Sequence, residues 1–266
     1  MRHRPHYSLE TAMTSAPLTL YTFAMSHFSE KIRWTLDACQ LPYEERCLTP
    51  VFHMPTALRL GRRGQTTLPI VQQGSVAVQD SPRIVDWLET CQGTLSILPQ
   101  AQHEAIRQIE QRFDSIGKDV ARLLYAGSFG VADGHIRQLW TAHANPLQTL
   151  FIRLAYPLIC LGFRRKLNIN AASAARASER IGAQLDWLEA QLADGRRYLI
   201  GDQLSLADIT AASLLAPIAC PAEHPVYGDA AYQAGMAGTL APWQARPGMA
   251  WVRELYRQQR YSQTAC

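Results

Sequence analysis

Residues 18–36 read LTLYTFAMSHFSEKIRWTL, and this stretch decides the fold. Leu, Tyr and Phe separated by Thr over residues 18–23 predict a short buried strand. After a break at residues 24–27, apolar residues recur with the spacing of an amphipathic helix at Phe28, Ile32, Leu36 and Cys39. Ser26 therefore lies between a strand and the first turn of a helix, where free backbone N–H groups and the helix dipole favour an anion.

A second strand pair follows the first helix. Thr67–Val71 is an apolar strand, Gln73-Gly74 predicts a hairpin turn, and Val76–Val78 is the return strand. Residues 79–81 (QDS) then lead into another amphipathic helix. A Ser before a helix most often caps it, so the local pattern leaves open whether Ser26 is a cap or a reactive-site hydroxyl.

Taken together, the two segments resemble the N-terminal thioredoxin-like domain of cytosolic glutathione transferases. The resemblance implies that Ser26 faces the glutathione sulfur, with Ser29 as a second candidate. It implies that the backbone at Leu68 and Pro69, usually a cis peptide in that family, holds the cysteinyl part. The same resemblance implies that Asp80 and Ser81 bind the γ-glutamyl end of glutathione. Arg33 matches a basic residue often found in the first helix of that family.

One loop departs from that family pattern. Many transferases carry an Asn-Pro and a Gly-Lys before the strand-opening proline, whereas this chain has GRRGQTT at residues 61–67. The residues that hold the glycyl carboxylate are therefore left open, with ordinary surface roles as the alternative for each candidate: His53, Arg62, Arg63 and Gln65. Residues 49–66 are predicted to form a loop with at most one helical turn.

Helical periodicity dominates the second half of the chain. Long apolar stripes run over residues 106–123 and 181–192, and residues 125–172 between them are expected to form an irregular insertion, helical over 147–161 but interrupted at Pro157. In GDQLSLADI at 201–209, Ser205 and Asp208 have the spacing of a capping box. This motif resembles the capping segment in the C-terminal helical domain of glutathione transferases.

These patterns predict an α/β thioredoxin-like N-terminal domain and an all-helical C-terminal domain. We expect a flexible extension at residues 1–16, the glutathione-binding domain at 17–92, a linker at 93–100 and the helical domain at 101–266. The family resemblance also predicts a homodimer, formed by the helix that carries Trp87 and the first long helix of the second half.

Composition excludes several classes of function. The 266 residues include 26 basic and 22 acidic side chains, without the clustered basic stripe of a nucleic-acid groove. Six cysteines without a CxxC pair and eight dispersed histidines give no support for a metal site, and a cytoplasmic location is expected. The apolar run at 150–163 is interpreted as a core or interface segment rather than a membrane span, so no membrane partner is expected.

The resemblance implies an enzyme that uses glutathione as co-substrate. Ser26 is expected to stabilise the thiolate for conjugation, addition or isomerisation of a small hydrophobic electrophile bound by Phe113, Tyr125 and the helix at 205–217. The alternative is a non-catalytic glutathione-binding or scaffold protein. Thiol–disulfide exchange requires a Cys at position 26 or 29, and both are Ser. His27 is expected to be exposed and without a chemical role.

Overall fold

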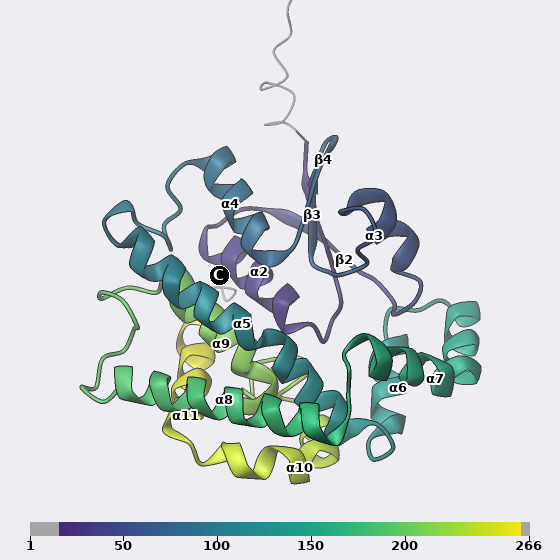
Figure 1. Cartoon of the computed structure of the whole chain (residues 1–266). Helices are drawn as coiled ribbons and strands as arrows, with labels where there is room; N and C mark the ends of the chain where they lie inside the picture. Colours follow the sequence, from purple (N-terminus) through teal and green to yellow (C-terminus); the bar gives the residue numbers. More distant parts are fainter. Residues whose placement is uncertain (1–15, 262–266) are drawn as a thin grey trace, which may run out of the picture.

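A four-stranded mixed sheet organises the first third of the chain in the computed structural model, which describes residues 16–261 (Figure 1). The extension predicted for residues 1–16 lies outside the described part except for Ala16. The strands are β1 (Leu18–Thr22), β2 (Tyr43–Cys47), β3 (Ile70–Gln73) and β4 (Val76–Gln79). Their spatial order is β2-β1-β3-β4, with β1 parallel to β2 and antiparallel to β3.

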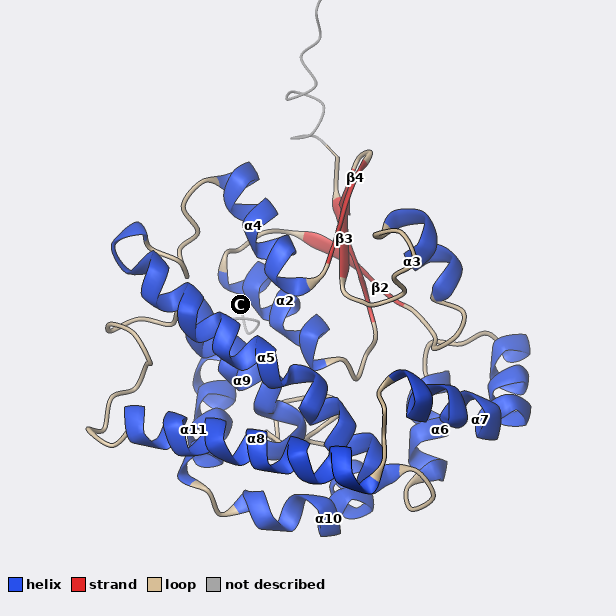
Figure 2. Ribbon diagram, viewed as in Figure 1, coloured by secondary structure: helices blue, strands red, loops and turns tan. Residues whose placement is uncertain are grey.

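Helices cover both faces of this sheet (Figure 2). On one face lie α2 (His27–Ala38) and α4 (Ser81–Gln92), and on the other lies α3 (Met54–Leu60). Side chains alternate between the faces of a strand. Leu20 and Val71 accordingly join the main core, whereas Tyr21 and Ile70 pack with Ala57 of α3. The two-turn helix α3 replaces the loop expected at this place.

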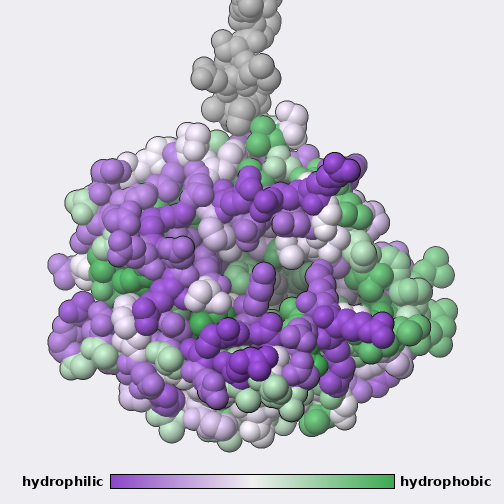
Figure 3. Space-filling view, viewed as in Figure 1, coloured by the Kyte–Doolittle hydropathy of each residue, from purple (hydrophilic) through white to green (hydrophobic). Residues whose placement is uncertain are grey.

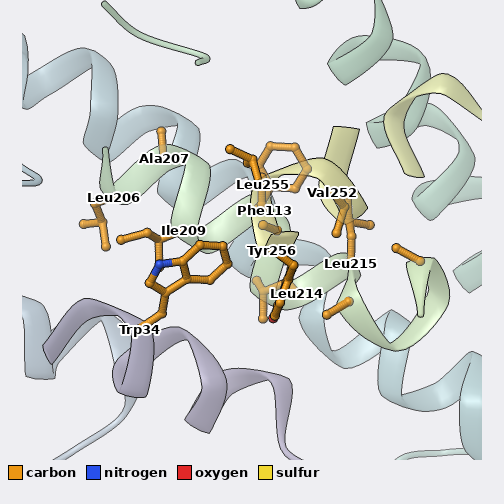
Figure 4. Close-up of a cluster of buried hydrophobic side chains, with 14 of the residues drawn as sticks. Trp34, Phe113, Leu206, Ala207, Ile209, Leu214, Leu215, Val252, Leu255 and Tyr256 are labelled. Carbon is orange, nitrogen blue, oxygen red and sulfur yellow. The ribbon is translucent and has the colours of Figure 1, made fainter. Parts of the chain in front are cut away.

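The rest of the described chain is helical. After a short 3₁₀ segment at Gln100–Gln102 it consists of α5 (His103–Ser128), α6 (Asp133–Thr141), α7 (Pro146–Lys166), α8 (Ala171–Gln191), α9 (Leu206–Ala219), α10 (Ala230–Gln244) and α11 (Pro247–Leu255), followed by a π-helical turn at Tyr256–Arg260. Helix α9 is buried along its whole length and packs against α2, α5 and α11. Figure 4 shows Ile209 and Leu214 of α9 in one buried cluster with Trp34 of α2 and Tyr256, whose rings lie 4.8 Å apart.

The capping box predicted at the start of α9 is present. The Asp208 carboxylate accepts hydrogen bonds from the backbone N–H of Ser205 at 2.9 Å and of Leu199 at 2.7 Å. Burial raises the pKa of Asp208 to about 6, against the opposing effect of these donors. The motif therefore fixes both the start of α9 and the loop before it.

Two expectations for the second half are wrong. Residues 125–172 are regular rather than irregular, because α5 extends to Ser128 and α6 and α7 follow directly. Helix α7 also runs through Pro157 without interruption. Pro157 lies on the exposed side of the helix, where water can satisfy the Arg153 carbonyl that loses its usual donor.

Candidate functional site at the sheet edge

Ser26 occupies the turn between β1 and α2 and caps the helix. Its Oγ accepts a hydrogen bond from the backbone N–H of Ser29 at 3.2 Å, and its side chain is partly exposed. Because the cap uses Oγ only as an acceptor, the hydroxyl hydrogen remains available to a ligand. Ser26 is therefore both a structural cap and a donor at the positive end of a helix.

The strand register brings the other expected binding residues to the same edge of the sheet. Tyr21 pairs with Ile70, and Ile70 pairs with Gln79. One residue further toward this edge, Thr22 of β1, Pro69 directly before β3 and Asp80 directly after β4 lie in one row. Neighbouring strands lie about 4.8 Å apart. The Asp80 N–H donates to the Pro69 carbonyl at 3.3 Å, and the Leu68–Pro69 peptide is cis. Ser26 follows Thr22 by four residues and leaves from this same edge.

Asp80 and Ser81 begin α4 with unusual geometry. Asp80 has φ of 91°, which non-glycine residues rarely adopt, and such conformations cluster at ligand sites. The Asp80 side chain is exposed and makes no capping bond, whereas Ser81 is 1% exposed and its Oγ has no hydrogen-bond partner. A buried hydroxyl without a partner is costly, so a ligand that bonds to Ser81 at this helix start would satisfy it.

His27 is buried, so the expectation that it is exposed is wrong. Its Nε2–H donates to the Gly117 carbonyl of α5 at 2.9 Å. Burial lowers the pKa of His27 to about 4, so the ring is neutral at pH 7. Because this ring nitrogen is bonded to α5, His27 serves as a structural link between α2 and α5. Ser29, the second hydroxyl candidate, is fully buried and its Oγ has no partner.

The ionic contacts that hold α2 come from residues far away in the chain. Lys31 is fully buried and pairs with Glu110 and Asp114 of α5, each at 2.7 Å. On another side, Glu30 pairs with Arg260 at 2.7 Å. These partners lie 79 to 230 positions away, so no local motif could reveal them.

Arg33 fixes the turn that carries Ser26. Its guanidinium donates to the Phe23 carbonyl at 3.0 Å and to Glu45 of β2 at 2.7 Å. On the other side of the turn, the hydroxyl of Tyr227 donates to the Met25 carbonyl. Two backbone carbonyls directly before Ser26 are thus held by side chains from distant parts of the chain.

The 61–67 loop is organised by a side chain that sequence reasoning missed. The Gln79 amide donates to the Thr67 carbonyl and accepts from the Arg62 N–H, both at 2.7 Å. His53 is buried rather than on the surface, and its ring bonds to the Thr66 carbonyl at 2.9 Å. Burial lowers the pKa of His53 to about 4, which makes it a poor partner for a carboxylate.

A small aromatic cavity adjoins the Ser26 turn. Its volume is about 40 Å³, enough for a few water molecules. The walls include Phe23 and Met25 from the turn, with Tyr125, Trp140 and Phe163 from α5, α6 and α7. Tyr125 lines it as expected.

Two other parts of the pocket expectation are wrong. Phe113 lies in the core against Trp187, and helix α9, which covers the predicted 205–217 wall, is wholly buried. A much larger cavity, of about 1210 Å³, lies between α2, β2 and the 198–204 loop and shares Ala24, Leu139 and His143 with the small one. Two of its charged side chains, Arg33 and Arg260, are paired with carboxylates. Within residues 16–261, no group of three or more His, Cys, Asp or Glu could hold a metal ion.

The sheet order β2-β1-β3-β4 with helices on both faces, joined to an all-helical half, is a thioredoxin-like domain followed by a helical domain. Residues 20–94 match the family model "Glutathione S-transferase, N-terminal domain", and residues 171–232 match "Glutathione S-transferase, C-terminal domain". The chain belongs to the glutathione S-transferase family, and the fold class predicted from the sequence is confirmed.

Solved structures share this fold at low sequence identity. A glutathione S-transferase from Methylobacillus flagellatus, solved with glutathione bound, has a TM-score of 0.60 at 14% identity, covering 93% of this chain and 98% of its own. The beta-etherase LigF from Sphingobium has a TM-score of 0.58 at 20% identity, and the match covers 89% of this chain and 98% of that one. A glutathione S-transferase from Methylobacterium radiotolerans, in complex with glutathione sulfonate, has a TM-score of 0.54 at 19% identity, and the match covers 88% of this chain and 93% of that one. The curated proteins compared with this chain gave no match.

Proposed function

We propose that this protein binds glutathione at the sheet edge and uses Ser26 to stabilise its thiolate for attack on a small hydrophobic electrophile. The observation that carries the proposal is the strand register, which aligns the Ser26 turn, the cis Leu68–Pro69 peptide and Asp80 along one edge. The glutathione-bound structure of the Methylobacillus flagellatus relative supports the same ligand.

The γ-glutamyl end is assigned to Asp80 and Ser81. The exposed Asp80 carboxylate suits the ammonium group of glutathione, and the unpartnered Ser81 hydroxyl at the start of α4 suits its carboxylate. The cis Leu68–Pro69 segment offers backbone groups to the cysteinyl part. These contacts position the thiol and do not themselves activate it.

Ser26 supplies the activation. A free thiol has a pKa near ~8.5, so only a small fraction is thiolate at neutral pH. Donation from the Ser26 hydroxyl and the field of the α2 N-terminus both favour the charged sulfur. A hydroxyl cannot form a mixed disulfide, so conjugation, addition or isomerisation is favoured over disulfide reduction.

Ser26→Ala tests this role. The variant loses its helix cap at a cost of about 0.5–2 kcal/mol, so it should remain folded and bind glutathione nearly as tightly as the parent. The ultraviolet thiolate signal of the complex should titrate at higher pH, and turnover at neutral pH should fall while recovering at alkaline pH. Ser29→Ala is the matched control. Coincident titrations of parent and Ser26→Ala contradict the proposal, and a shift confined to Ser29→Ala moves the role to Ser29.

A second candidate is glutathione binding without turnover. The small volume of the aromatic cavity beside the Ser26 turn favours it, because that cavity by itself holds nothing larger than a few water molecules. A panel of electrophiles of increasing size distinguishes the two functions. Glutathione affinity with no product from any electrophile establishes the binding protein.

A further inference from the structure

Helix α7 turns an apolar face to the outside. Leu147, Leu154 and Leu158 are 78%, 75% and 72% exposed. The full stripe follows the i, i+3, i+4 spacing of one helix face at Leu147, Leu150, Phe151, Leu154, Leu158 and Leu161. It covers on the order of several hundred Å², which marks an interaction surface on a water-soluble fold. Of the two alternatives expected for residues 150–163, a core or an interface segment, the exposure of this face excludes the core.

The opposite face of α7 is packed on the protein. Ile152 and Tyr156 are buried, and the Tyr156 ring lies 5.6 Å from that of Trp140 on α6. Although α7 has the length and composition of a membrane-crossing helix, its buried face is committed to the fold. The geometry suits a helix that lies along a surface rather than one that crosses a bilayer.

The two chain segments around the stripe carry basic side chains and no acidic ones, although Asp133 accepts a hydrogen bond from Tyr156 on the packed face of α7. Residues 48–79 and 134–178 contain no Asp or Glu, but nine of the 26 basic residues of the chain: Arg59, Arg62, Arg63, Arg137, Arg153, Arg164, Arg165, Lys166 and Arg176. All 22 acidic residues lie elsewhere, so the remainder of the chain has an acidic excess. This asymmetry is invisible in the net charge of +4.

The two acid-free segments meet in space beside the stripe. Lys166 Nζ at the end of α7 donates to Thr66 Oγ1 at 3.0 Å, and the rings of Phe52 and Phe151 are 5.4 Å apart. Figure 3 shows hydrophobic side chains gathered on the right, over the α7 end of the molecule. Arg153 and Arg165 are exposed and form no ion pair with any described residue.

We propose that the leucine stripe of α7 docks onto an anionic lipid surface, with the exposed side chains of Arg153, Arg165 and Lys166 bound to lipid headgroups. Apolar side chains that enter the headgroup boundary and basic side chains near it are the two contributions that hold interfacial helices. A second copy of this chain fits less well. A two-fold contact through α7 would set the same acid-free, basic face against itself, and like charges across an interface oppose association.

The test uses the full-length protein and vesicles of phosphatidylcholine with or without phosphatidylglycerol. We expect flotation with the anionic vesicles, little with pure phosphatidylcholine, and weaker binding at high salt. Leu154→Gln with Leu158→Gln should weaken binding by roughly 100-fold. Arg153→Gln with Arg165→Gln should weaken it by roughly 30-fold. Because these side chains are exposed, the unfolding midpoints should match the parent.

Arg83→Gln with Lys118→Gln is the matched control, since it removes the same charge from exposed sites on α4 and α5 and should leave binding within about threefold. Equal binding by the leucine variant and the parent overturns the proposal, as does the absence of flotation with anionic vesicles. Light scattering on the same variants tests the competing occupant: if the leucine variant turns a dimer into a monomer, α7 is a contact between copies and the lipid proposal fails.

Discussion

Replacing Lys31 with Met should expose how strongly the two halves of the molecule are coupled. The ammonium of Lys31 is fully buried and pairs with Glu110 and Asp114, whose side chains are 3% and 13% exposed. Met fills similar space but leaves the Glu110 carboxylate without its main counter-charge. Burial already raises the pKa of Glu110, against the opposing charge of Lys31. Removing one partner of a buried ion pair lowers the free energy of unfolding by about 3–5 kcal/mol. Because Arg107 remains 2.7 Å from Glu110 and keeps part of the counter-charge, we expect a loss of about 3 kcal/mol.

Urea unfolding at fixed protein concentration measures this loss. The deficit should shrink as the pH falls, because the raised pKa of Glu110 lets the folded variant take up a proton that removes the buried charge. Lys31→Met combined with Glu110→Gln should recover at least half of the loss. Arg46→Met, which breaks an exposed pair with Glu44, is the control and should change stability by less than about 0.5 kcal/mol. A loss below about 1 kcal/mol at pH 7, or a double variant no better than Lys31→Met, refutes the reasoning.

Three further predictions concern stability. Burial lowers the pKa of His27, His53 and His224 from 6.5 to about 4. Between these pH values the unfolded chain binds more protons than the folded one, so the free energy of unfolding should fall as the pH drops from about 6.5 to 4. The loss should be up to about 3 kcal/mol for each histidine. Asp208 and Glu110, whose pKa values are raised, act in the opposite sense but are two groups against three histidines. Urea midpoints that do not fall as the pH drops from about 6.5 to 4 contradict the assignment. Asp208→Ala should cost about 2–4 kcal/mol at pH 7, because two buried backbone N–H groups lose their acceptor; thermal unfolding checks this, and a loss below about 1 kcal/mol rules it out. Gly117→Ala should lower the free energy of unfolding by about 1–3 kcal/mol, since the new Cβ would lie 2.2 Å from the Phe28 ring. Gly182→Ala is the control: its Cβ would enter open space, and the variant should be more stable by about 0.5–1 kcal/mol. Equal unfolding midpoints for the two variants argue against the contact with Phe28.

Local patterns predicted the elements that carry the site. The strand and helix around Ser26, the β3–β4 hairpin and the Ser205–Asp208 cap all depend on residues within a few positions of one another, where periodicity and capping chemistry act. The order of these elements sufficed for the family resemblance. The roles of Ser26, Leu68, Pro69, Asp80 and Ser81 remain predictions, supported by the shared edge on which the strand register places them.

The wrong expectations for His27 and Phe113 share a cause. His27 looks exposed in the sequence because it stands at the start of a helix, yet α5 approaches at Gly117 and covers it. Phe113 looks available to a pocket because it is aromatic, yet Trp187 of α8 covers it. Burial is set by the elements that pack on a residue, and these lie tens of positions away.

Neighbouring residues were enough to predict the strands and helix around Ser26, the β3–β4 hairpin and the start of α9. The contacts of Lys31, Glu30 and Arg33 that hold α2, and the side of α7 that faces out, depend on elements distant in the chain. Helix α7 is apolar on both faces, so its sequence has no polar side to mark the solvent. The packing of Ile152 and Tyr156 on α6 uses one apolar face and thereby leaves the leucines of the other exposed.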